Sequence, residues 1–418
     1  MPTKEALLYA KSNEELREMC RDNDLPASGN KDDLVERLAG YLRKDDIESP
    51  LSVSSMIANA TSSYNSILAN SSSTQDVDDT DADDPWGEPG GSKDAQKSSE
   101  KSEAHSKFFS ALESEKGECK GSLGRVREAM RKEFKERNEV VDGMLTAILA
   151  GEHLFLLGPP GTAKSHIVRS FCAATIGLEG YFQWLLGRFS TPEDLFGPLS
   201  IPALQAGEYK RITTKKLPEA KVAFLDEIFK GNNAILNSLL TIVNERLFFD
   251  GTKEIRVPLQ TMFGASNEIP TSPELGAIYD RFALRYDVGY LKDESAFLEL
   301  LETAGRGDLS TPPKMIRDEE LLSFQKEAQA VNVPAKIKET LSKIRNRLKD
   351  NGKRTSVSDR KWVKIQKIVK AHAYLFGHQT VQMPHLEIIR HALWETPKQK
   401  AVADQVVAEA IKAAVQSA

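Results

Sequence analysis

Residues 154–165, which read LFLLGPPGTAKS, constrain the fold of this chain more than any other segment. A short apolar run is followed by a Gly-rich turn and then by a Lys-Ser pair that opens an amphipathic helical pattern. This order is typical of a loop whose backbone N–H groups wrap the phosphates of a nucleotide at a helix start. In such a loop the lysine reaches the β- and γ-phosphates, and the hydroxyl binds Mg²⁺. The segment therefore predicts a site for a nucleoside triphosphate and Mg²⁺ made of Gly158, Pro159, Pro160, Gly161, Thr162, Ala163, Lys164 and Ser165.

The segment departs from the usual pattern at one position, because Ala163 stands where a second glycine is expected. Taken alone, it is also compatible with an ordinary strand, turn and helix. Residues 221–227, KVAFLDE, supply the second half of the expected site as an apolar strand that ends in two carboxylates. Asp226 is expected to bind Mg²⁺ beside Ser165, and Glu227 to orient and deprotonate the attacking water. An ordinary strand before an acidic helix start is the alternative, which the neighbouring phosphate loop disfavours.

Two later segments add polar residues near strand ends. Residues 260–267, QTMFGASN, form another apolar run that ends in Asn267, whose amide could aim the water, although Asn is also a common turn residue. Residues 279–290, YDRFALRYDVGY, place Arg281 just before a predicted strand and Arg285 within it. An arginine in such a place can stabilise the charge of the transferred phosphate on a neighbouring subunit.

These elements, in this order, resemble those of the AAA+ ATPases. The segments GPPGTAKS, FLDEIFKGNNAILNSLLTIVNER, GASNE and IYDRF are similar to the MoxR family, in particular to its RavA-type members. The resemblance covers residues 121–395 and implies an α/β core with a parallel five-stranded sheet of order 5-1-4-3-2. It makes Asn267 the sensor 1 residue and Arg281 the arginine finger, with Arg285 as the second choice. Residues 357–362, VSDRKW, resemble the sensor 2 segment with Arg360 as the lid arginine; a capped surface helix start is the alternative.

Two insertions are expected within the core. Residues 247–257, LFFDGTKEIRV, alternate around Asp250-Gly251, a pattern that predicts a hairpin with a type I′ turn. It resembles the hairpin that precedes sensor 1 in this branch of the family. Residues 190–217 form a long stretch punctuated by Pro and Gly, which resembles the helix-2 insert, a loop or hairpin that faces the pore of ring-shaped relatives. A long surface loop is the alternative, although loops of this length are usually functional or disordered.

Residues 1–45 are expected to form a separate helical hairpin. A capping box at residues 12–15 opens the first helix, residues 25–29 (LPASG) end it, and residues 30–33 cap the second. The apolar residues that would face inward are Leu16, Met19, Cys20, Leu34, Leu38, Tyr41 and Leu42. This pattern resembles the SAP domain, which commonly binds DNA. Between residues 11 and 44, seven basic residues stand against eight acidic ones, so DNA binding and protein docking stay equally open.

The remaining segments complete the predicted domain organisation. Residues 46–106 are rich in Ser, Asn and Asp and predict a flexible linker. The ATPase core is expected at 107–291, and helical spacing over 292–418 predicts a helical lid with a final Ala-rich helix. The 418 residues carry a net charge of −5, three widely spaced cysteines and no apolar run of about 18 residues. These features predict a cytoplasmic protein without a membrane span or secretory signal.

The resemblance also implies a function. It implies an ATP-hydrolysing motor that uses Mg²⁺ and forms a homo-oligomeric ring, expected to be hexameric, in which the finger acts on the neighbouring subunit. It further implies remodelling or chaperone-like action together with a partner that carries a von Willebrand factor A domain. Two other functions stay open. They are a DNA-associated motor anchored by residues 1–45 and a nucleotide-gated scaffold with little turnover, which the intact Asp226-Glu227 pair disfavours.

Overall fold

The computed structural model describes residues 13, 16, 17, 20, 28–41, 108–110, 112, 116–119, 121–251, 253–270, 272–304, 312–350 and 357–416. The predicted linker of residues 46–106 lies outside them. The chain divides into two compact units, Met1–Ser63 and Tyr64–Ala418. Within the described residues, no helix has the length and apolar character needed to cross a membrane.

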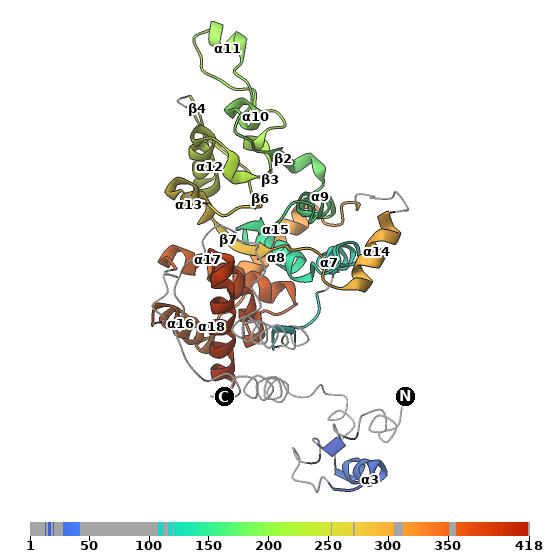
Figure 1. Ribbon diagram of the computed structural model, residues 1–418. Helices are drawn as coiled ribbons and strands as arrows, with labels where there is room; N and C mark the ends of the chain where they lie inside the picture. Colours follow the sequence, from blue (N-terminus) through green and yellow to red (C-terminus); the bar gives the residue numbers. More distant parts are fainter. Residues whose placement is uncertain are drawn as a thin grey trace, which may run out of the picture. The chain divides into compact units, whose positions relative to one another are not determined.

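The second unit is built around a parallel five-stranded sheet (Figure 1). Its strands are β1 (His153–Leu157), β2 (Tyr181–Leu185), β3 (Val222–Asp226), β6 (Thr261–Ser266) and β7 (Phe282–Asp287). The spatial order β2-β3-β6-β1-β7 confirms the predicted order 5-1-4-3-2 when the strands are counted along the chain. In register, Leu157 pairs with Ser266 on one side and with Asp287 on the other. The carboxyl ends of the strands are therefore aligned, which brings the residues that follow them together.

Helices cover both faces of this sheet. On one face, Phe171 of α9 (Lys164–Thr175) packs edge-on against Phe263, with 5.6 Å between the ring centroids. On the other face, Phe155 contacts Phe229 and Tyr279 at 5.3 and 5.1 Å. The remaining helices around the sheet are α7 (Gly121–Glu133), α8 (Asn138–Ala150), η1 (Leu178–Gly180), η2 (Leu217–Glu219), η3 (Ile228–Lys230), α12 (Asn233–Glu245) and α13 (Pro273–Tyr279). This three-layer packing explains why β1 is buried along its whole length and why its last four residues, Leu154 to Leu157, are all apolar.

The residues after β7 are helical, as the sequence predicts. They form α14 (Glu294–Ala304), α15 (Asp318–Ala330), α16 (Ala335–Asp350), α17 (Asp359–Leu375), η4 (Met383–Ala392) and α18 (Pro397–Gln416). Helices α15 and α17 pack on α8, while α18 packs on α16 and η4. Within the helical lid predicted over residues 292–418, η4 is a 3₁₀ helix that is buried along Pro384–Ala392.

Both predicted insertions lie at the end of the second unit opposite α16 and α18 (Figure 1). The predicted hairpin is confirmed as β4 (Leu247–Asp250) paired antiparallel with β5 (Lys253–Arg256). Its turn is shifted by one residue from the prediction, because Asp250 still pairs with Lys253 as the last residue of its strand. The Asp250 carboxylate accepts hydrogen bonds from the Arg211 backbone N–H at 2.9 and 3.1 Å, which removes it from the turn and joins the two insertions.

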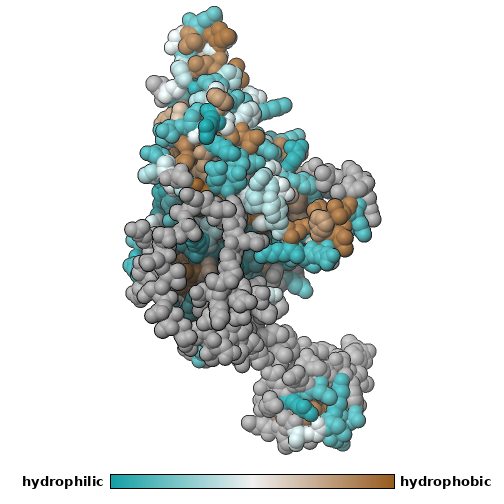
Figure 2. All heavy atoms as spheres, viewed as in Figure 1, coloured by the Kyte–Doolittle hydropathy of each residue, from teal (hydrophilic) through white to brown (hydrophobic). Residues whose placement is uncertain are grey.

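The helix-2 insert contains α10 (Pro192–Phe196) and α11 (Ile201–Gln205), and an antiparallel bridge links Leu199 to Arg211. Figure 2 shows apolar surface gathered at its tip. The exposed apolar residues of the insert include Ile201, Leu204, Tyr209 and Ile212, with exposed fractions between 47% and 68%. The insert is thus structured and apolar at its end rather than a polar surface loop.

The described part of the first unit contains α3 (Lys31–Tyr41). Asn30 and Asp33 each accept a hydrogen bond from the backbone N–H of the other at 3.0 Å, so the predicted cap of the second helix is confirmed. Among the residues predicted to face inward, four are fully buried: Leu16, Cys20, Leu34 and Leu38. The predictions for Ser12, Met19 and Leu42, and for the side chain of Tyr41, lie outside the described residues.

Candidate functional site

The predicted phosphate loop connects β1 to α9 through residues 158–163. Ala163 adopts φ 62° and ψ 24°, the left-handed region in which an L-residue is less stable by about 1–2 kcal/mol. This conformation explains why a glycine is the usual residue there. The Lys164 Nζ donates to the carbonyl oxygens of Gly158 and Pro159 at 2.6 and 2.8 Å. Burial lowers the pKa of Lys164, while Asp226 and Glu227 act in the opposite direction.

The loop is held against the ends of both neighbouring strands. The Gly158 N–H donates to the Ser266 carbonyl at the end of β6, at 3.1 Å. A Cβ atom at Gly158 would lie 2.2 Å from the Val288 carbonyl oxygen, so only glycine fits between β1 and β7 at this point. The Tyr290 hydroxyl donates to the Pro160 carbonyl at 3.3 Å. The start of the loop is therefore fixed by the sheet itself.

Ser165 and Asp226 meet directly beneath this loop. The Ser165 Oγ donates to the Asp226 Oδ2 at 2.7 Å, although the two residues belong to α9 and to the end of β3. The other carboxylate oxygen of Asp226 accepts the Glu227 N–H at 3.0 Å. A hydroxyl and a carboxylate in contact, beside a loop that can wrap phosphates, are the hard oxygen ligands that suit Mg²⁺. The residues present therefore fit the predicted ion.

Glu227 follows β3 with φ 50°, a left-handed conformation that costs a non-Gly residue about 1 kcal/mol or more. Its Oε2 lies 3.3 Å from the Lys230 Nζ, in an ion pair without hydrogen-bond geometry. Asn267 directly follows β6, the strand between β1 and β3. The three adjacent strands β3, β6 and β1 thus end in the carboxylates, the amide and the phosphate loop, which is where a water and a γ-phosphate would meet.

Arg281 lies at the opposite, amino-terminal end of the strands. It precedes Phe282, the first residue of β7, which pairs with His153 at the start of β1. The five residues of β1 span roughly 17 Å at about 3.3 Å per residue, so Arg281 cannot reach the phosphate loop of its own chain. Its guanidinium, on a side chain that is 19% exposed, forms an ion pair with Asp280 at 3.2 Å.

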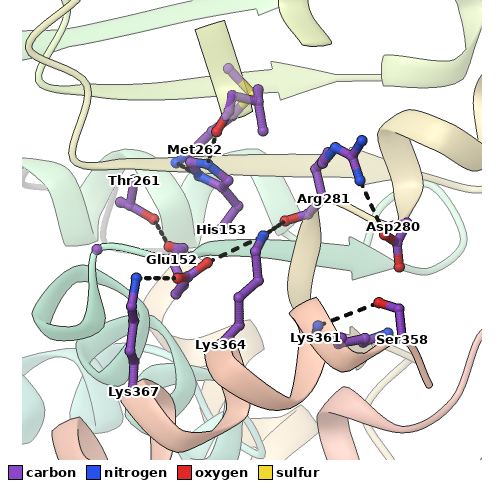
Figure 3. Close-up of polar contacts among 12 residues, drawn as sticks. Glu152, His153, Thr261, Met262, Asp280, Arg281, Ser358, Lys361, Lys364 and Lys367 are labelled. Atoms are coloured by element: carbon purple, nitrogen blue, oxygen red, sulfur yellow. Dashed lines mark hydrogen bonds and ion pairs between the residues drawn. The ribbon is translucent and has the colours of Figure 1, made fainter. Parts of the chain in front are cut away.

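A charged cluster surrounds Arg281 at this amino-terminal side of the sheet (Figure 3). The Lys364 Nζ of α17 donates to the backbone carbonyl of Arg281 at 3.1 Å and lies 3.3 Å from the Oε2 of Glu152. Glu152, which immediately precedes β1, also pairs with Lys367 at 3.4 Å. The cluster therefore links the lid, the start of β1 and the segment that carries Arg281.

Arg285 does not fit the role of an alternative finger. Its side chain is 0% exposed and lies between the sheet and the lid, with the guanidinium 4.1 Å from the centroid of the Tyr279 ring. It donates to the carbonyl oxygens of Trp394 and Tyr279 at 2.6 and 3.2 Å. The sequence prediction for this residue is corrected, because a fully buried arginine with these partners is inaccessible to a neighbouring subunit.

Arg360 is exposed in the first turn of α17, and the predicted cap is confirmed, since the Ser358 side chain accepts from the Lys361 N–H. Arg360 lies one helical turn before Lys364, so the two share a face of α17. Its charge helps to lower the pKa of Lys364. Arg360 therefore belongs with Arg281 at the amino-terminal side of the sheet and not with the phosphate loop of its own chain.

The structure thus brings together Lys164, Ser165, Asp226, Glu227 and Asn267, and it separates Arg281, Arg285 and Arg360 from them. Sequence reasoning missed Glu152 and Lys364. A carboxylate immediately before an apolar strand and the lysines of KWVKIQK at helical spacing are the signals that the sequence holds. Neither signal indicates that the start of β1 and helix α17 are in contact.

Comparison with known families supports the assignment of each region. Residues 121–323 match the MoxR domain of MoxR-vWA-beta-propeller ternary systems. Residues 336–407 match an AAA lid domain, and residues 11–43 match the SAP domain.

Similar proteins agree with this result. An uncharacterized protein of Methanocaldococcus jannaschii is 42% identical over 277 residues, which are 66% of this chain and 72% of the relative. A second protein of that organism is 40% identical over 274 residues, or 65% of this chain and 70% of the relative. The crystal structure of a candidate ATPase from Cytophaga hutchinsonii shares the fold, with a TM-score of 0.55 at 16% identity over 73% of this chain and 96% of that one. The chain therefore belongs to the MoxR family of AAA+ ATPases, with an AAA lid domain and an N-terminal SAP domain.

Proposed function

We propose that this chain is a subunit of a ring-shaped motor that hydrolyses ATP at a site shared between neighbouring subunits. The observation that carries the proposal is the convergence at the ends of three adjacent strands, where Ser165 contacts Asp226 at 2.7 Å beside the phosphate loop. Arg281 and Arg360, which would act on the nucleotide of a neighbouring subunit, lie at the amino-terminal ends of the strands. One subunit therefore supplies the phosphate loop and another supplies the arginines.

Binding of ATP would use contacts that the loop now makes with itself. Lys164 would exchange the carbonyls of Gly158 and Pro159 for the β- and γ-phosphate oxygens, while backbone N–H groups of residues 158–164 receive the remaining phosphate oxygens. Ser165 and Asp226 would hold Mg²⁺, which screens phosphate charge when it is bound.

Hydrolysis requires a water placed in line with the γ-phosphate. Glu227 would accept its proton, and Asn267, at the end of the central strand β6, would fix its orientation. Arg281 and Arg360 of the neighbouring subunit would neutralise the charge that develops on the transferred phosphate. In this proposal Arg360 senses the neighbour's nucleotide, because it is remote from its own phosphate loop.

The proposal is tested by ATP turnover of the parent and of Glu227→Gln. The variant should retain ATP binding and lose turnover by on the order of a hundredfold, because a general base contributes about that much. Lys164→Ala should lose ATP binding itself. Glu319→Gln is the matched control, since Glu319 is an exposed glutamate of α15 and should leave both properties unchanged. Turnover of Glu227→Gln equal to that of the control would contradict the assignment.

The family suggests what the motor acts on. Because the matching family is described from systems that contain a vWA component, we propose a partner with a von Willebrand factor A domain and a remodelling role on a protein. The exposed apolar tip of the helix-2 insert is suited to contact a protein chain. A cytoplasmic location, a hexameric ring and domain boundaries near residues 45, 106 and 291 belong to the same proposal.

A DNA tether is the second proposal, favoured by the SAP match over residues 11–43. The balance of seven basic and eight acidic residues in this region allows only a few phosphate contacts, so binding should be weak and fall on a shallow slope with salt. Deletion of residues 1–45 should abolish DNA retention and leave ATP turnover intact. Loss of a protein partner instead, with no DNA binding by the full chain at low salt, would identify a docking domain.

A further inference from the structure

The cluster around Arg281 contains a lysine that lies at the other end of β1 from the phosphate loop of its own chain. Lys364 is the lysine of α17 that reaches the Arg281 segment, and its side chain is 18% exposed. Its Nζ bridges the Glu152 carboxylate and the Arg281 carbonyl, at 3.3 and 3.1 Å (Figure 3). A lysine has three donors, so both contacts can be made together.

The contact acts on the backbone carbonyl of Arg281 and does not involve its guanidinium. The backbone position sets the point from which the side chain projects toward a neighbouring subunit. Within the described residues, the guanidinium forms an ion pair with Asp280 at 3.2 Å, and the Asp280 side chain is 38% exposed. Such an exposed pair constrains geometry weakly. The two cations are about equally exposed, but Glu152 is only 7% exposed, so the lysine contact is the better shielded of the two and restrains the backbone from which the Arg281 side chain projects.

Glu152 opposes the effect of burial on the pKa of this lysine and pairs with its Nζ at 3.3 Å. Burial lowers the pKa of Lys364, and Glu152 is the largest opposing influence. The Glu152 side chain is 7% exposed, and its backbone carbonyl accepts a hydrogen bond from Thr261 Oγ1 at the start of β6. Glu152 is anchored to the central strands. Lys364 therefore holds the Arg281 backbone in a position fixed by the rigid sheet and not by the lid alone.

We propose that Lys364 is a positioning residue for Arg281, which it aligns for use by the neighbouring subunit's ATP site. The inference rests on the proposed function of Arg281. It assigns Lys364 to the half-site that a subunit gives to its neighbour and not to the half-site in which that subunit binds its own ATP. Misplacement of a transition-state group by about 1 Å can cost on the order of a hundredfold in rate, so a modest shift of this backbone is sufficient.

Mixed subunits separate the two half-sites. Arg281→Ala subunits keep the phosphate loop, and Lys164→Ala subunits keep the arginine, so their mixture should regain turnover that neither has alone. If it does not, the shared site of the proposed function fails, whatever the role of Lys364. With that baseline established, Lys364→Met is placed in each partner in turn.

Lys364→Met combined with Lys164→Ala should recover about tenfold less turnover, or lower still, when mixed with Arg281→Ala. Lys364→Met alone, mixed with Lys164→Ala, should regain the baseline, because its own phosphate loop is intact. Lys364→Arg should restore the first mixture in part, since arginine can also bridge a carboxylate and a carbonyl. A purely structural defect would instead impair Lys364→Met in both positions.

Lys367→Met is the matched control, because Lys367 also pairs with Glu152 at 3.4 Å from the same helix and makes its contact without Arg281. Lys367→Met combined with Lys164→Ala should rescue Arg281→Ala as well as Lys164→Ala does. Three results would each overturn the proposal. The Lys367→Met, Lys164→Ala subunit could lose as much turnover in the mixture as the Lys364→Met, Lys164→Ala subunit, or the latter could restore turnover fully. Lys364→Met alone could also fail to regain the baseline when mixed with Lys164→Ala.

Discussion

We expect substitution of Arg285, within β7, to destabilise the fold and substitution of Arg281, just before β7, to leave its stability nearly unchanged. Arg285→Ala removes donors from two buried carbonyls, those of Trp394 and Tyr279, and each unsatisfied carbonyl costs about 1–3 kcal/mol. A cavity under the Tyr279 ring adds to this loss, and relief from burying the charge offsets part of it. We expect a net destabilisation of about 3 kcal/mol and a fall of roughly 6 °C or more in Tm.

Arg281→Ala is the comparison variant. Its ion pair with Asp280 is partly exposed and contributes about 0–1 kcal/mol, so Tm should change little while hydrolysis is lost. The assay is thermal unfolding without nucleotide, followed by ATP turnover of the folded variants. If Arg285→Ala unfolded at the temperature of the parent and failed to supply the neighbour's arginine in mixed assemblies, Arg285 would be the trans-acting residue and its assignment to the buried core would be wrong.

Two further predictions concern single residues. Ala163→Gly should raise stability by about 0.5–1 kcal/mol without loss of ATP binding, because glycine adopts φ 62° without the Cβ penalty; a lower Tm would contradict this. Burial lowers the pKa of Lys361 from 10.5 to about 7, so between these values the unfolded chain binds more protons and stability should rise with pH. Lys361→Met should therefore unfold at a higher temperature than the parent at pH 7, by a margin that narrows toward pH 10, and a constant margin would refute the assignment.

The sheet order was predicted from the resemblance to the AAA+ ATPases, and the phosphate-loop half of the site was predicted from local patterns in the sequence. The phosphate loop follows the carboxyl end of β1, and Asp226 lies at the carboxyl end of β3. These ends lie close together in any parallel sheet of this order. The hairpin was also predicted, while its turn was displaced because Asp250 binds Arg211 of a distant insertion.

The other half of the site depends on how the lid packs, which no local pattern contains. The sequence of residues 282–287 predicts a strand, but it does not indicate that the lid covers the face of β7 on which Arg285 lies. The same packing brings Lys364 to the amino-terminal side of the sheet, together with Arg360 on the same face of α17. Contacts between residues more than 200 positions apart, such as Lys364 with Glu152, decide where these arginines lie.

The central claim is that a complete ATP site requires two subunits. It is tested most directly by ATP turnover per subunit across a dilution series, with the assembly state measured by sedimentation in the same samples containing Mg²⁺ and ATP. Turnover per subunit should fall in step with dissociation and approach zero for the monomer, because loss of a trans arginine costs on the order of a thousandfold or more. A monomer that hydrolyses ATP as fast as the assembly would contradict the claim.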